Sequence, residues 1–303
     1  MKVKPVTAGW YNAFRPWSLH GAVVPIVLGG VVALNHGVFV PWVFVLVLIG
    51  GILLQSACNL LNTYGDFKLG IDTEENHPRS PELVTGALEP KSILMAGLAC
   101  LGLTALIGIP LIWNIGWGIL FFGIAGLAFA GTYTVGIAYK YRGLGLVFVF
   151  IAMGMLMPLG TYYAMAGKLS LEALLLGLPN AFLITGVLSG NEMRDYHTDL
   201  EAGIRTLSGR IGHRAGMALY VFLNTACYPA LAVLIIVRVL HPACALAFAA
   251  LLFWRRLYGN SKEAADGGRP AFMMVPYAFK HNWIFGALLA IGYYVGFAIL
   301  PGL

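Results

Sequence analysis

Charged residues are scarce in this sequence, and their scarcity excludes most classes of soluble protein. Charged side chains make up 11% of the 303 residues, whereas hydrophobic side chains make up 59%. An ordinary soluble domain carries about 25% charged residues. A water-soluble globule is therefore excluded, and no large extramembrane domain fits between the hydrophobic blocks.

Cysteine is also scarce, and the basic residues form no continuous block. The four cysteines, Cys58, Cys100, Cys227 and Cys244, lie in apolar stretches without a CxxC or Cys/His pairing. This pattern predicts free, buried thiols rather than disulfides or metal ligands. The formal net charge is +6, but its basic residues alternate with hydrophobic blocks, so we expect no nucleic-acid partner.

Long apolar runs predict nine membrane-spanning helices. A helix crosses a bilayer with about 20 apolar residues, whereas barrel strands show alternating segments of about ten. The runs cover residues 19–34, 41–62, 92–112, 116–135, 143–165, 171–190, 215–237, 242–254 and 282–300. We therefore expect an all-α, polytopic integral membrane protein, with residues 1–303 forming a single membrane-embedded domain.

The positions of Lys and Arg predict the orientation of these spans. Of the 19 basic residues, 17 lie at the N-terminus or in loops on the same side, and only Lys168 and Arg238 lie on the other. Because cytoplasmic loops are enriched in Lys and Arg, we expect the N-terminus in the cytoplasm of a cell membrane and the C-terminus outside.

The acidic residues gather in two loops on the predicted cytoplasmic side. Ten of the 13 follow the second or the sixth span: Asp66, Asp72, Glu74, Glu75, Glu82 and Glu89, then Glu192, Asp195, Asp199 and Glu201. We interpret Glu82, Glu89 and Glu201 as solvating helix ends. The aspartates show a more specific pattern.

Asn59, Asn62 and Asp66 have the spacing i, i+3, i+7, which places them on one face of a helix leaving the membrane. Asp72 lies six residues beyond Asp66, on a different face of an ideal helix. It joins the same site only if the chain turns near Gly70, and glycine permits such a turn.

The second loop has a similar arrangement. Asn191, Asp195 and Asp199 have the spacing i, i+4, i+8, again on one helical face. The pattern Asp-x-x-x-Gly-Ile occurs at residues 66–71 and again at 199–204. Because both copies follow a predicted span, we expect a pseudo-repeat of two half-bundles.

Facing carboxylates repel each other unless a cation lies between them. Oxygen ligands without His or Cys suit Mg²⁺, which commonly bridges carboxylates to a substrate phosphate. Basic residues lie nearby in the sequence: Lys68, Arg79, Lys140, Arg142, Arg194 and Arg205. The combination predicts a site for a diphosphate at the membrane surface, with an attached lipid tail between the helices.

Two motifs resemble the UbiA superfamily of intramembrane prenyltransferases. Residues 59–72, NLLNTYGDFKLGID, are similar to its first aspartate-rich motif, and residues 191–207, NEMRDYHTDLEAGIRTL, to its second. The second motif looks most like the branch that prenylates 1,4-dihydroxy-2-naphthoate in menaquinone biosynthesis. Shorter pieces at 15–16, 133–134, 141–145 and 160–163 are also similar to that branch.

The resemblance implies a role for each matching residue. Catalytic metal ligands for two Mg²⁺ ions would be Asp66, Asp72, Asp195 and Asp199, with Asn62 and Asn191 as neutral ligands. Candidates for binding diphosphate are Arg79, Lys140, Arg194, Arg205 and Lys68. Candidates for lining the pocket of the allylic cation and acceptor are Tyr64, Tyr133 and Tyr139.

The implied activity is Mg²⁺-dependent transfer of a polyprenyl group from a polyprenyl diphosphate to an aromatic acceptor such as 1,4-dihydroxy-2-naphthoate. Within the family the acceptor could instead be 4-hydroxybenzoate, homogentisate or a glycerol-phosphate ether. A secondary transporter or ion channel is the alternative of another class. Transport sites lie near the bilayer midplane, whereas these acids lie at helix exits, which favours the transferase.

Overall fold

The computed structural model describes residues 8–73, 81–264 and 267–298, and throughout these ranges the regular secondary structure is helical. The helices of the first half are α1 (Trp10–Phe14), η1 (Pro16–Ser18), α2 (His20–Asn35), α3 (Pro41–Lys68), α4 (Pro81–Val84), α5 (Pro90–Ile115), α6 (Ile119–Gly131) and η2 (Tyr139–Arg142). Those of the second half are α7 (Gly145–Val149), η3 (Phe150–Leu156), α8 (Met157–Ala166), α9 (Leu171–Arg194), α10 (Tyr196–Glu201), α11 (Leu207–Ile211), α12 (His213–Ile236), η4 (Pro242–Ala250), α13 (Leu251–Glu263) and α14 (Gly268–Ala298).

Within the described ranges, six helical segments are long and apolar enough to cross a membrane. They are Trp10–Asn35, Pro41–Lys68, Pro90–Ile115, Gly145–Ala166, Leu171–Arg194 and His213–Ile236. The all-helical membrane architecture is as expected, but the count of nine spans is not confirmed.

The remaining three predicted spans differ from a simple crossing helix. The run 116–135 forms α6, whose 13 residues are shorter than the about 20 that a perpendicular crossing needs. The run 242–254 is divided between the 3-10 helix η4 and α13. The last helix, α14, begins at Gly268 rather than near residue 282 and has Pro276 in its interior. Hydropathy located these apolar blocks, but it does not determine where a helix begins or changes its winding.

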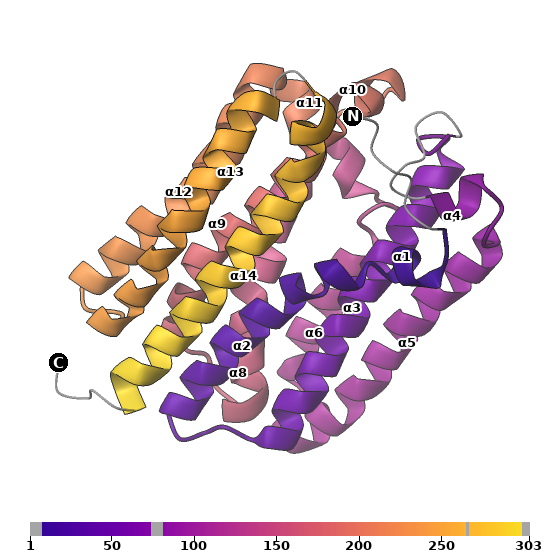
Figure 1. The fold of residues 1–303 in the computed structure, drawn as a ribbon. Coiled ribbons are helices and arrows are strands. Elements are labelled where there is room, and N and C mark those ends of the chain that lie inside the picture. The colour runs from indigo at the N-terminus through magenta and orange to yellow at the C-terminus, as the bar shows by residue number, and fades with distance from the viewer. Residues whose placement is uncertain (1–7, 74–80, 265–266, 299–303) are drawn as a thin grey trace.

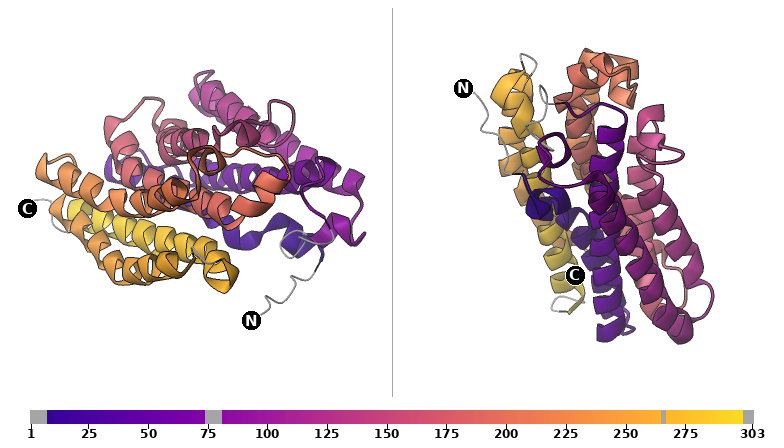
Figure 2. Two further views of the ribbon diagram at one scale, coloured as in Figure 1. Left: turned by 90° about the horizontal axis from the view of Figure 1, so that it is seen from above. Right: turned by 90° about the vertical axis from the view of Figure 1, so that its right-hand side faces the viewer.

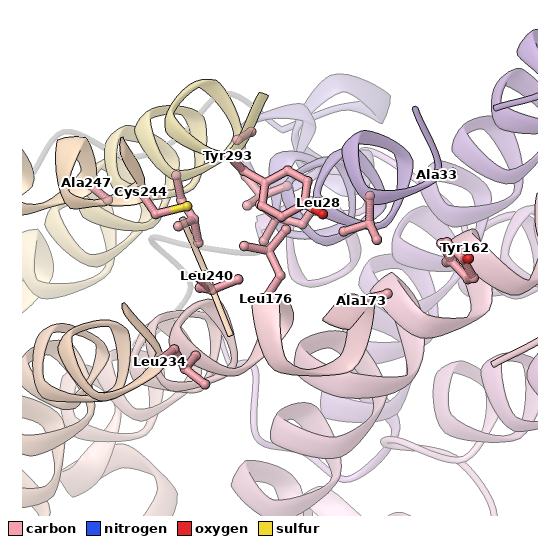
Figure 3. Packing of buried hydrophobic residues seen from close by; sticks show 14 of the residues in the cluster. Leu28, Ala33, Tyr162, Ala173, Leu176, Leu234, Leu240, Cys244, Ala247 and Tyr293 are labelled. Atoms are coloured by element: carbon pink, nitrogen blue, oxygen red, sulfur yellow. The ribbon is translucent and has the colours of Figure 1, made fainter. Parts of the chain in front are cut away.

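The centre of the bundle is built around α9, which packs against α2, α12 and α14 (Figures 1 and 2). Figure 3 shows part of the apolar core, where Leu28 of α2, Leu176 of α9 and Tyr293 of α14 come together. Small residues let these helices approach closely: a Cβ added to Gly154 would collide with the backbone of Ala181.

Hydrogen bonds join four helices at the end of the bundle where α2 ends and α9 begins. The Glu172 carboxylate accepts a hydrogen bond from the Tyr293 hydroxyl at 2.7 Å and pairs with His36 Nε2 at 2.8 Å. His36 Nδ1 lies 2.8 Å from the hydroxyl oxygen of Tyr162. This network joins the helices at one end of the bundle. The aspartate-rich segments lie at the opposite end, near α4, α10 and α11 in Figure 1.

Candidate active site

The first aspartate-rich segment leaves the bundle through a tight helix end. Helix α3 stops at Lys68, and Gly70 adopts a left-handed conformation with φ of 70°. The amide of Ile71 then donates to the carbonyl of Asp66 at 2.9 Å, which is the bond of a Schellman cap. The turn predicted at Gly70 is present, and it returns Asp72 to the cavity that Asp66 lines.

The second aspartate-rich segment ends in the same way. Gly203 has φ of 74°, and the Ile204 amide donates to the Asp199 carbonyl at 2.8 Å. The helix that precedes it is interrupted rather than continuous, because α9 ends at Arg194 and α10 starts after Asp195. The likeness of the two Asp-x-x-x-Gly-Ile patterns is therefore a likeness of backbone structure as well as of sequence.

Both segments line one cavity of about 800 Å³ that continues between the membrane helices. The polar candidates on its wall are Asn62, Asp66, Asp72, Lys140, Asn191, Arg194, Asp195 and Asp199. The rest of the wall is mostly apolar and includes Ile107 and Gly108 of α5, Phe122 of α6 and Met157 of α8. A single chamber thus joins a charged end to an apolar interior.

Asp66 is held by two neighbours from the segment that contains η2. The ammonium group of Lys140 lies 3.0 Å from each carboxylate oxygen and also donates to the Asn62 side-chain oxygen at 3.0 Å. The Tyr141 hydroxyl donates to Asp66 Oδ1 at 2.6 Å, and burial with the adjacent Asp66 charge raises the pKa of Tyr141. Tyr141 begins one of the shorter similar pieces, residues 141–145, but the spacing of the aspartates could not single it out as the neighbour of Asp66.

Asp195 is paired with its own sequence neighbour. Arg194 donates from Nε to Oδ1 at 2.9 Å and from the guanidinium NH₂ group to Oδ2 at 2.8 Å. Such a two-point contact matches the planar guanidinium to the planar carboxylate, and a diphosphate offers oxygens of the same kind. Arg194 thus lies at the charged end of the cavity with its guanidinium group paired to Asp195.

Burial and neighbouring charges both act on Asp72. Burial raises the pKa of Asp72 to about 6, and the nearby Asp66 carboxylate adds to the effect. Arg15 and Lys140 act in the opposite direction, since their positive charges favour the ionised carboxyl. A further cation beside Asp72 would favour its ionised form in the same way.

Two of the three candidate tyrosines line the cavity. The rings of Tyr133 and Tyr139 meet edge to face with centroids 5.3 Å apart, and the Tyr139 hydroxyl donates to the Phe129 carbonyl at 2.8 Å. Tyr64 instead packs in a separate apolar cluster with residues such as Leu60.

The remaining basic candidates have different positions. Lys68 and Arg205 are exposed, and within the described chain neither lines the cavity. Lys68 lies over the ring of Tyr64, 5.9 Å from its centroid. Arg79 lies outside the described residues.

The structure adds residues that the spacing of the motifs did not reveal. Arg15, which follows α1, lines the cavity and donates to the Thr63 hydroxyl at 3.3 Å. Glu192 also lines it and is only 4% exposed. The interpretation of Glu82 as a solvated helix end is wrong, because Glu82 is completely buried and accepts a hydrogen bond from Asn12. The sequence contained no sign that α1 covers this carboxylate.

The donor set suits Mg²⁺, although the side chains are not arranged around a metal. Carboxylate and amide oxygens from both motifs face one cavity, and Mg²⁺ prefers such oxygen ligands. Among the described residues, however, no three Asp, Glu, His or Cys side chains form a group that could hold a metal ion. Asp66 and Asp195 are bound instead to Lys140 and Arg194.

Comparison of the sequence with known families and proteins gives consistent matches. The UbiA prenyltransferase family model matches residues 22–284. The 1,4-dihydroxy-2-naphthoate octaprenyltransferase of Bacillus subtilis is 28% identical over 93% of this chain and 91% of that protein. UbiA prenyltransferase domain-containing protein 1 of Homo sapiens is 33% identical over 70% of this chain and 64% of that protein.

Solved structures share the fold at low sequence identity. A UbiA homolog from Archaeoglobus fulgidus, bound to GPP and Mg²⁺, superposes with a TM-score of 0.59 at 13% identity, covering 95% of this chain and 99% of that one. A structure of digeranylgeranylglyceryl phosphate synthase gives a TM-score of 0.57 at 15% identity, covering 96% and 98%. At these identities the likeness establishes the fold alone.

Proposed function

Because this chain belongs to the UbiA prenyltransferase family and is an integral membrane enzyme, we propose that it transfers a polyprenyl group from an allylic diphosphate to an aromatic acceptor. The observation that carries the proposal is the single cavity whose charged end is lined by both aspartate-rich motifs and whose interior is apolar. Such a chamber is complementary to a molecule with a diphosphate head and a hydrocarbon tail.

The chain's own residues bind and orient the donor. Arg194 would contact diphosphate oxygens. Asp66, Asp72, Asp195 and Asp199 would hold two Mg²⁺ ions, with Asn62 and Asn191 as further oxygen ligands. When bound, Mg²⁺ neutralises charge on the departing diphosphate, as preorganised cations do in many enzymes. The rings of Tyr133 and Tyr139 lie on the cavity wall, where their faces stabilise an allylic cation.

For the acceptor we propose 1,4-dihydroxy-2-naphthoate, which makes this a menaquinone-pathway enzyme. The likeness to the Bacillus subtilis octaprenyltransferase over nearly the whole chain supports this choice, as does the motif at residues 191–207. A ring carbon bonds to the allylic carbon while the allylic C–O bond breaks. The same ring carbon then loses its carboxylate as CO₂, so the reaction balances without another reagent.

We propose that the protein lies in the cell membrane and that the aspartate-lined end of the bundle is on the cytoplasmic side. The distribution of Lys and Arg supports that orientation, since 17 of 19 lie on the side that holds both motifs. Cysteine scanning with a membrane-impermeant thiol reagent tests it, because a cysteine at exposed Arg214 should react only from the cytoplasmic side. Reaction from outside intact cells contradicts the orientation.

The metal site is tested by replacing aspartates from the two motifs. We expect Asp66→Ala or Asp195→Ala to abolish Mg²⁺-dependent release of diphosphate from a polyprenyl diphosphate while the protein still folds. Glu201→Ala is the matched control, because Glu201 is an exposed acid at the same end that does not line the cavity. Full activity of either aspartate variant contradicts the assignment.

The acceptor is tested by product analysis. Purified protein is incubated with Mg²⁺, a polyprenyl diphosphate and, in separate reactions, 1,4-dihydroxy-2-naphthoate, 4-hydroxybenzoate and homogentisate. We expect the naphthoate to give the main product, with a mass that reflects prenylation and loss of CO₂. A product that retains its carboxylate, or preference for another acid, contradicts the naphthoate assignment.

A further inference from the structure

Asp66 is already paired with a cation in the arrangement that the structure describes. Both of its carboxylate oxygens lie 3.0 Å from the ammonium nitrogen of Lys140, and Oδ1 also accepts from Tyr141 at 2.6 Å. Asp66 lines the cavity, so a divalent cation bound there would lie beside the ammonium group, and the two like charges would repel each other. Movement of Lys140 away from Asp66 would therefore favour binding of a divalent cation by Asp66.

A second carboxylate near Lys140 is buried and only half satisfied. Glu192 Oε2 accepts from the Ser208 amide at 2.9 Å and from the Ser208 hydroxyl at 2.7 Å. Its other oxygen, Oε1, is buried and lacks a hydrogen-bond partner within the part of the chain that the structure describes. An unsatisfied buried carboxylate oxygen is costly, so its retention on a cavity wall calls for a function.

The backbone brings this oxygen within reach of Lys140. The point where a Cβ would lie on Gly145 is 3.8 Å from Glu192 Oε1 and 3.8 Å from the Lys140 Cα. These two distances limit how far the Lys140 Cα can lie from Glu192 Oε1. A lysine side chain, with four methylene groups, is long enough to reach across that separation. Glycine at position 145 adds no side chain of its own between them, and the nearest side-chain atom to this point is Leu188 Cδ2, at 3.4 Å.

We propose that Lys140 is exchanged between two carboxylates, pairing with Asp66 before a divalent cation binds and with Glu192 when the cation occupies Asp66. This inference rests on the proposed metal site at Asp66. In the exchanged state the ammonium group satisfies Glu192 Oε1, and Asp66 becomes available to the metal. Glu192 is thus a positioning residue, which acts through Lys140 rather than on the substrate.

The exchange keeps the charged groups of the site paired. Without Glu192, a cation that displaced Lys140 from Asp66 would leave a buried ammonium group without its carboxylate partner, which is strongly unfavourable. With Glu192 present, each positive charge has an acceptor before and after metal binding. The second carboxylate therefore increases the affinity for the divalent cation even though it does not contact it.

A double-mutant cycle on cation affinity tests this exchange. Binding of Mn²⁺ to the purified full chain is measured by electron paramagnetic resonance without diphosphate or a prenyl donor, so that no added anion can pair with the displaced lysine. We expect Glu192→Gln to weaken Mn²⁺ binding by about tenfold or more, because the displaced lysine loses its second partner. In a Lys140→Met background the same substitution should change the affinity by less than about twofold.

One further variant separates this role from a structural one. Ser208→Ala removes a donor to Oε2 but leaves Oε1 in place, so Mn²⁺ affinity should remain near that of the unmodified chain. The exchange is overturned if Glu192→Gln weakens Mn²⁺ binding equally with and without Lys140. It is also overturned if Ser208→Ala weakens Mn²⁺ binding as much as Glu192→Gln does. Either result gives Glu192 a purely structural role. Failure of the metal site itself looks different: the unmodified chain and Asp66→Ala would bind Mn²⁺ equally weakly, which overturns both proposals.

Discussion

Arg15 is a cation of the candidate site that lies outside both aspartate-rich motifs. It follows the short helix α1, adopts a left-handed conformation with φ of 51°, and places its guanidinium group on the cavity wall. Its charge favours ionised Asp72, so it belongs to the same electrostatic unit as the first motif. An arginine in this position is suited to a diphosphate, whose oxygens accept charge-assisted hydrogen bonds.

We expect Arg15→Gln to raise the KM for polyprenyl diphosphate by about tenfold, the loss typical of one charge-assisted hydrogen bond. Thr63 still donates to the Asn59 carbonyl in this variant, so the local fold should persist. Arg214→Gln is the matched control, because Arg214 is exposed and does not line the cavity. The KM is measured by steady-state kinetics at varied concentrations of polyprenyl diphosphate. An unchanged KM for Arg15→Gln would show that Arg15 does not bind the donor.

The sequence predicted that the aspartates of both motifs belong to one site, but not what they contact. Asp66, Asp195 and Asp199 do line one cavity, although the helix is interrupted at Asp195 and does not carry Asp195 and Asp199 on one continuous face. The pairing of Asp66 with Tyr141 depends on how a segment 75 residues away in sequence folds back, and local spacing contains no such information. Burial of Glu82 escaped prediction for the same reason.

At the scale of the helix, the two motifs share one stop signal. Asp66 and Asp199 occupy equivalent positions in Schellman caps, with Gly70 and Gly203 in the left-handed conformation that the cap requires. A Cβ on Gly70 would meet nothing within 4 Å, so only backbone conformation restricts this position. The cap is therefore what brings Asp72 back to the site.

Substitution of Gly70 tests the importance of that conformation. We expect Gly70→Ala to lower the free energy of unfolding by about 1 to 2 kcal/mol, because an L-residue is strained at positive φ. Gly70→Asn should lose less, since asparagine tolerates the left-handed region.

Thermal unfolding in one detergent, together with diphosphate release, measures both effects. Gly102→Ala is the control, because Gly102 lies inside α5, where an added Cβ also meets nothing within 4 Å. If Gly70→Ala has the stability and activity of the unmodified chain, the cap does not position Asp72.

Hydropathy predicted the long helices well because every backbone amide in lipid must be paired within its own segment. It did not reveal the π-helix η3, which occupies Phe150–Leu156 inside the predicted span 143–165. Winding of this kind depends on neighbouring helices: Gly154 of η3 lies against Ala181 of α9, too close for any side chain. Several η3 residues, including Ala152 and Met153, line the cavity.

For the whole molecule, the depth of the cavity limits the prenyl tail that it accepts. Gly108 lies on the cavity wall 18 residues after the start of α5 at Pro90, which corresponds to about 27 Å along the helix. A Cβ on Gly108 would meet nothing within 4 Å, so a larger side chain there extends into open space. Gly102 of the same helix is exposed and does not line the cavity, so the chain provides its own control.

We expect Gly108→Phe to reduce transfer from a long polyprenyl diphosphate by at least about tenfold, while transfer from a short one such as geranyl diphosphate stays within about twofold. The added ring occupies space that only the distal isoprene units reach, and displacing buried methylene groups costs about 0.8 kcal/mol each. The comparison is of kcat/KM for donors of increasing length, with Gly102→Phe expected to leave their order unchanged. If Gly108→Phe lowers kcat/KM equally for short and long donors, the tail does not extend to α5 at this depth, and its path must leave the cavity closer to the aspartates.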